Sequence, residues 1–118
     1  MALRPAKDID WVAMTGLSPP DEWFGYVEAT NHLVEGIGAI YRDGDDRWWV
    51  TFQRLPFVSK VKTAHKAAKQ LIAAARERGI EVRAIADPRI DGAELWIERL
   101  GFQRTDETIE GHAVWLIQ

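Results

Sequence analysis

Basic side chains gather in one short stretch of this sequence. Residues 60–69, KVKTAHKAAK, hold four of the five lysines. Residues 60–78 carry six basic residues against Glu77 alone, a net charge of +5, and because the whole chain carries −3 the remainder sums to −8. Ammonium groups at the start of a helix add to its affinity for phosphate, whereas the same groups further along form a solvated helix face. The cluster is therefore either an anion site or the outer side of an amphipathic helix.

Composition limits the classes of function that the chain can have. Its 118 residues are 47% hydrophobic and 28% charged, as in ordinary globular proteins, and we expect a single domain over residues 1–118. Outside the basic stretch the acidic balance repels phosphates, so we expect no specific nucleic-acid partner. The sequence has no cysteine, no long apolar run and no secretory leader pattern in its first residues, so we expect a cytoplasmic protein without a membrane partner.

The histidines and tryptophans are further candidates for functional groups. His32, His65 and His112 stand far apart, with no second ligand at metal-binding spacing, so we expect no metal site. The six tryptophans indicate core packing and a homodimer interface more than a cofactor box. Trp48 and Trp49 are neighbours on an expected strand and should point to opposite faces of a sheet.

Periodicity and turn signals predict the elements that position these groups. Strands are expected at 2–6, 26–30, 34–42, 47–55, 80–87, 102–106 and 112–117, and helices at 7–17, 61–78 and 88–101. Residues 21–26, DEWFGY, fit either a helical turn or the beginning of a strand. Ile9, Val12 and Ala13 give the first helix its apolar spacing, and the second helix has the stripe Ala64, Ala68, Leu71, Ile72 and Ala75. We expect the core to contain Ala67, Leu71, Ala74 or Ala75, Trp96, Leu100 and Phe102.

This element order predicts an α/β fold. Three consecutive hairpin-connected strands make much of the sheet antiparallel, while the strand–helix–strand unit at 48–86 adds a parallel crossover. The expected architecture is a mixed, mostly antiparallel twisted sheet with helices on both faces.

Several segments together resemble the GNAT family of acetyl-CoA-dependent N-acyltransferases. They are LRPAKDID at 3–10, VEGIGAIYRDGDDRWWVTFQRLP at 34–56 and AELWIERLGFQR at 93–104, which ends in a helix followed by Gly-Phe. The resemblance covers nearly the whole chain. It implies the GNAT fold, acetyl-CoA as co-substrate, and an amine on a small molecule or a protein as acceptor.

The cofactor loop of the family is where this chain departs from the resemblance. Pro56 matches the family's proline, but Ser59 stands at the arginine position, and Lys60, Lys62 and Ala64 stand at the three glycine positions. Glycine lets backbone N–H groups approach a diphosphate closely, so its absence matters. By resemblance, the cofactor-binding residues are Gln53, Leu55, Ser59, Lys60, Lys62 and Thr63, with the lysines in place of the lost loop.

The family's catalytic positions also differ. Residues 47–55 hold no carboxylate, and Ile97 occupies the position of the proton-donating tyrosine four residues before Gly101. The neighbouring Trp96 has an indole N–H that is too weakly acidic for that role. The sequence thus assigns no catalytic residue. Two functions stay open: an N-acyltransferase using acetyl-CoA, or a catalytically degenerate GNAT-fold protein with an interaction role, similar to compact proteins of tailed phages and prophages.

Overall fold

The computed structural model describes residues 2–30, 33–54, 61–86 and 92–117. Its elements follow the predicted order of strands and helices. They are β1 (Ala2–Pro5), α1 (Asp8–Thr15), β2 (Trp23–Thr30), β3 (Leu33–Arg42), β4 (Trp48–Arg54), α2 (Val61–Glu77), β5 (Val82–Ile85), α3 (Ala93–Arg99), β6 (Gln103–Ile109) and β7 (His112–Ile117). Of the stretch 21–26, which the sequence left open, residues 23–26 already belong to strand β2.

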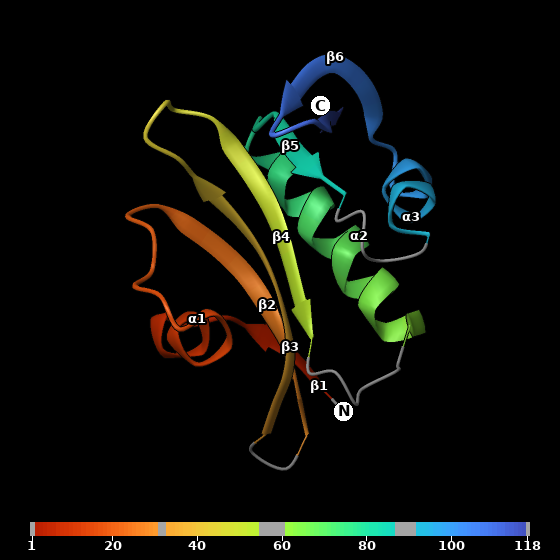
Figure 1. Ribbon diagram of the computed structural model, residues 1–118. Coiled ribbons are helices and arrows are strands. Elements are labelled where there is room, and N and C mark those ends of the chain that lie inside the picture. The colour runs from red at the N-terminus through yellow and green to blue at the C-terminus, as the bar shows by residue number, and fades with distance from the viewer. Residues whose placement is uncertain (1, 31–32, 55–60, 87–91, 118) are drawn as a thin grey trace.

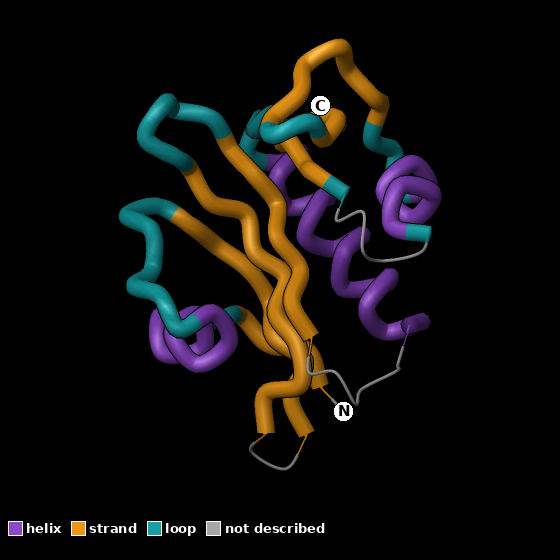
Figure 2. Tube along the Cα trace, in the orientation of Figure 1, coloured by secondary structure: helices purple, strands orange, loops and turns teal. Residues whose placement is uncertain are grey.

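The strands form one seven-stranded sheet in the order β1-β2-β3-β4-β5-β7-β6. Every neighbouring pair is antiparallel except β4 and β5, which run parallel because helix α2 connects them. Helix α1 lies on one face of the sheet, and α2 and α3 lie on the other (Figures 1 and 2). The predicted mixed, mostly antiparallel α/β fold with helices on both faces is confirmed.

Helix α2 supplies the centre of the core. Ala68, Leu71, Ile72 and Ala75 are all buried, as the predicted stripe requires, while the side chain of Ala64 lies outside the described residues. Lys66, Lys69 and Arg76 are exposed on the opposite side of the helix. The helix ends at Glu77, and Gly79 takes a φ of +69°, a left-handed conformation that glycine adopts without strain.

The remaining core predictions hold except at Ala67, which is half-buried and is not part of this cluster. Leu100 and Phe102 are buried, and Trp96 packs partly buried against the same cluster. Ala75, rather than the half-buried Ala74, is the buried member of its pair. The cluster joins both helices to the sheet through Ile40, Val82, Ala84, Ala86, Ile97, Trp115 and Ile117.

Trp48 and Trp49 do point to opposite faces of the sheet. Trp48 packs against the α2 core and lies 6.3 Å from Phe24, measured between ring centroids. Trp49 is buried on the other face, where its indole N–H donates to Asp43. All six tryptophans are buried or partly buried, in keeping with the packing role expected of them.

The predicted apolar side of helix α1 is wrong. Ile9 and Val12 are 73% and 47% exposed, whereas Trp11 is buried against the rings of Trp23 and Tyr41 at centroid distances of 5.2 and 5.8 Å. The indole buries more apolar area than either aliphatic side chain, so it sets the rotation of this short helix. Gly16 ends the helix as predicted, with a φ of +72°.

An ion pair between the partly exposed Arg4 and the buried Asp10 also holds α1 in this rotation. Arg4 on β1 donates two hydrogen bonds of 2.8 Å to the carboxylate of Asp10, which also accepts the backbone N–H of Lys7 at 2.7 Å. Asp10 is 4% exposed. The hydrogen bonds from Arg4 lower the pKa of Asp10 despite its burial. Asp10 therefore caps the helix start and ties α1 to the edge strand.

No helix within the described ranges has both the length and the apolar character needed to cross a membrane.

Candidate functional site

Strands β4 and β5 separate soon after they meet. Their parallel ladder pairs Trp48 with Val82 and Trp49 with Arg83, and it has no further pair, although β4 continues to Arg54 and β5 to Ile85. The strands around Val50 and Ile85 therefore diverge among the described residues. Among the residues that the structure describes, the C-terminal half of β4 has no β5 partner, so its edge is open to an extended ligand that carries amide groups.

The predicted cofactor residues fall at the end of β4 and the start of α2. Gln53 belongs to β4, while Lys62 and Thr63 lie in the first turn of α2. Leu55, Ser59 and Lys60 lie outside the described residues, so the structure does not test them. In Figure 1 the C-terminal end of β4 and the N-terminal end of α2 lie at the same end of the molecule. The N–H groups at a helix N-terminus favour an anion.

The family's catalytic positions hold no proton-transfer group. Ile97 is 7% exposed and belongs to the core, so it contributes no chemistry. Its neighbour Trp96 donates its indole N–H to Nδ1 of His65 at 3.1 Å and packs edge-to-face on Phe52 of β4, with centroids 5.0 Å apart. Since Nδ1 accepts this bond, the neutral His65 ring carries its proton on Nε2. His112 lies in β7, which β5 separates from β4, and His32 lies outside the described residues.

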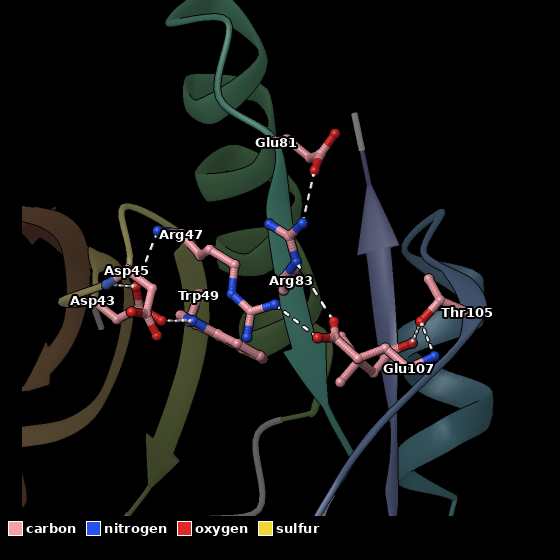
Figure 3. Close-up of polar contacts among 9 residues, drawn as sticks. Asp43, Asp45, Arg47, Trp49, Glu81, Arg83, Thr105 and Glu107 are labelled. Atoms are coloured by element: carbon pink, nitrogen blue, oxygen red, sulfur yellow. Dashed lines mark hydrogen bonds and ion pairs between the residues drawn. The ribbon is translucent and has the colours of Figure 1, made fainter.

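A charged network lies on the opposite face of the sheet from α2, beginning at the β3–β4 turn (Figure 3). The carboxylate of Asp43 accepts the backbone N–H groups of Asp45 and Arg47 at 2.8 and 3.0 Å and the indole N–H of Trp49 at 2.6 Å. The Arg47 backbone bond is the main cause of the lowered pKa of Asp43. The Arg47 guanidinium lies over the Trp49 ring, 5.2 Å from its centroid. Asp43 thus orients the residues that begin β4.

The network then crosses β5 to β6. Arg47 donates a 2.7 Å hydrogen bond to Oε2 of Glu107, and this bond raises the pKa of Arg47. Oε1 of Glu107 lies 4.0 Å from Nε of Arg83, whose terminal nitrogen lies 3.2 Å from Glu81. Figure 3 shows the Glu107 carboxylate between the two guanidiniums. Groups from the β3–β4 turn, β5 and β6 therefore meet beside Arg83, a member of the last β4–β5 pair.

Sequence reasoning did not find this network. Glu107 follows the end of the strand expected at 102–106, and Arg47 and Arg83 fall within the strands expected at 47–55 and 80–87. Glu107 and Arg47 are 60 residues apart, and no local pattern indicates that they bond. Within the described ranges, no three potential metal ligands come together.

The sheet order, the single parallel pair that separates at its C-terminal end, and the helix between those two strands define the GNAT acyl-CoA N-acyltransferase fold. Solved structures agree with this assignment. A predicted acetyltransferase from Clostridium acetobutylicum, crystallised with acetyl-CoA, superposes with a TM-score of 0.67 at 16% identity over 92% of this chain and 94% of its own. An acetyltransferase from Bacillus subtilis in complex with CoA gives 0.65 at 12% identity, covering 98% of this chain and 97% of its own.

The GNAT domain of Streptomyces lividans PAT superposes with a TM-score of 0.67 at 15% identity, over 95% of this chain and 69% of that one. At such identities the likeness shows the fold and leaves activity to be argued from the site. No protein-family model and no curated protein matches the sequence.

Proposed function

We propose that this protein is an N-acetyltransferase that transfers the acetyl group of acetyl-CoA to an amine. The observation that carries the proposal is the short β4–β5 ladder, which stops at Trp49 and Arg83 while β4 continues for five residues to Arg54. The open β4 edge offers backbone N–H and C=O groups to the two amides of a pantetheine arm. Structures of the same fold with acetyl-CoA or CoA bound support this reading.

The residues proposed for the cofactor divide into two groups. Gln53 and Leu55 flank the arm at the end of β4, and Ser59, Lys60, Lys62 and Thr63 face the diphosphate around the start of α2. The helix N-terminus fits an anion, and α2 has no acidic residue in its first turn to oppose one. Lysine side chains take the place of the missing glycine loop, because they contact phosphate as point charges without a close backbone approach.

The acceptor is proposed to be a primary amine on a small molecule or a protein. Attack by a neutral, well-placed amine on a bound thioester needs positioning more than a strong base.

One observation favours the other candidate function, a catalytically degenerate GNAT-fold protein with an interaction role. Ile97 is buried where family members place a proton donor.

The experiment that separates the two candidates is a transfer assay with the purified protein. Acetyl-CoA is supplied together with putrescine or with a lysine-containing peptide, and both free CoA thiol and acetylated amine are measured. The proposed function predicts equal amounts of the two products above the rate without protein. Thiol release without acetylated amine, or no release at all, would favour the degenerate protein.

A further inference from the structure

The pantetheine arm of the proposed cofactor runs along β4 from the start of α2. The inference drawn from this rests on the proposed function. Helix α2 begins at Val61, beyond the C-terminal end of β4, so a diphosphate held there lies at the wide end of the gap between β4 and β5. A pantetheine arm entering from that end runs back along β4 toward the place where the strands converge. Its thioester, at the far end of the arm, then lies near the last ladder pair, Trp49 and Arg83.

On the sheet face around that pair, Trp49 is buried beneath Arg47, and the β5 side is the exposed part. Trp49 and Arg83 project from the face opposite α2 and α3, because Trp48 and Val82 beside them pack into the α2 core. Ile85, the next residue of β5 on the same face as Arg83, is 38% exposed although it lies in a central strand. An amine therefore has a route to the thioester from the side that the two C-terminal helices leave uncovered.

Glu107 reaches this face from β6. Its Oε2 is held by Arg47 at 2.7 Å, and its Oε1, 4.0 Å from Nε of Arg83, makes no hydrogen bond within the described ranges. Glu81 contacts the tip of the Arg83 side chain, whereas Glu107 lies beside Nε, nearer the strand. The charged groups around Glu107 are thus Arg47 and Asp43 from the β4 side and Arg83 and Glu81 from the β5 side. Oε2 is therefore held by a short hydrogen bond, whereas Oε1 has the longer ion-pair contact with Arg83.

An irregularity in β6 aims Glu107 over the sheet. The β6–β7 ladder is interrupted between Arg104 and Thr108, and the Thr105 hydroxyl donates to the carbonyl of Val114 at 2.7 Å while accepting the N–H of Glu107 at 3.2 Å. Such irregularities re-aim side chains and are common beside active sites. Here the result is a carboxylate from an edge strand placed near the point where two central strands separate.

We propose that Glu107 is a catalytic residue that accepts the proton of the acceptor amine, with Arg47 and Arg83 as positioning residues. The amine nitrogen attacks the thioester carbonyl carbon, the C–N bond forms, and the C–S bond breaks with its electron pair moving to sulfur. The N–H proton passes to Oε1 of Glu107 and from there to the thiolate, giving the acetylated amine and CoA thiol. After the attack, the protonated nitrogen on the former carbonyl carbon is far more acidic than a free ammonium. The Glu107 carboxylate beside two guanidiniums therefore suffices to accept its proton.

The test compares Glu107→Gln with Asp106→Asn, which removes the same charge from the neighbouring exposed residue of β6. Glutamine keeps an oxygen for Arg47 but takes up no proton. With acetyl-CoA and putrescine or the lysine peptide, we expect Glu107→Gln to lower kcat roughly 100- to 10,000-fold. The Kd for acetyl-CoA and the urea midpoint should stay unchanged. Asp106→Asn should match the unaltered protein.

Three results would overturn this assignment. The first is a kcat for Glu107→Gln within about threefold of the unaltered protein, well short of the loss expected for a proton-transfer group. The second is an equal loss in Asp106→Asn. The third is a parallel loss of stability and acetyl-CoA binding, which would make Glu107 a structural tie between β4 and β6. If the unaltered protein binds no acetyl-CoA and acetylates neither acceptor, the proposed function fails as well, so the two failures are distinguishable.

Discussion

Leu71→Ala is the sharpest test of how helix α2 packs. Leu71 is 1% exposed, at the centre of the cluster that joins α2 to the sheet. The substitution removes three carbon groups, worth about 2.4 kcal/mol at about 0.8 kcal/mol each. A cavity term adds to this, because the site between helix and sheet collapses only in part, so we expect a total loss of about 3–4 kcal/mol. With stabilities of about 5–15 kcal/mol typical of domains, the variant should still fold.

Equilibrium unfolding in urea, followed by tryptophan fluorescence, measures this loss. Gln70→Ala is the matched control, because Gln70 is the preceding residue of the same helix and is exposed. It should change the free energy of unfolding by less than about 0.5 kcal/mol. A loss below that same value for Leu71→Ala would place the stripe at the surface and refute the assigned rotation of α2.

Two further substitutions test the other side of the sheet. Asp10→Asn should cost about 1.5–3 kcal/mol at neutral pH, the scale of hydrogen bonds to a charged group. Because the folded-state pKa of Asp10 is lowered, its contribution is present above the unfolded value of about 3.9 and lost as pH falls through the folded pKa. Urea midpoints of the two proteins should therefore converge in acid, and a gap that persists there would contradict the pairing. Gly25→Ala should prevent soluble expression, since a Cβ at that position would collide with the backbone carbonyl of Gly38, and a normal yield would refute the close approach of β2 and β3.

The order of elements was predictable because each one carries its own local signal. The DGDD turn between 43 and 46 indicated a hairpin, and the five-residue apolar stripe of α2 fixed both its existence and its buried face. Gly16 and Gly79 marked helix ends that the structure places at the same points. Such signals depend on neighbours within a few residues, so a single sequence contains them.

The errors and omissions concern contacts between distant segments. The spacing of Ile9 and Val12 suggested the buried side of α1, but an eight-residue helix turns toward whichever contacts are strongest, here the Trp11 rings and the Arg4–Asp10 pair. Glu107 joins the candidate site only because β6 is interrupted and its side chain crosses β5. Those arrangements follow from tertiary packing, which periodicity does not encode.

The measurement that tests the central claim most directly is calorimetric titration with acetyl-CoA and CoA, at low and near-physiological salt. The proposed site predicts binding of both ligands that weakens with salt, because exposed charges are screened over roughly 8–10 Å. Lys60→Ala with Lys62→Ala should cost about 1–3 kcal/mol, while Lys69→Ala with Arg76→Ala, exposed cations further along α2, should cost little. No heat with either ligand at millimolar concentration would contradict the account and leave the lysines as the solvated face of a helix.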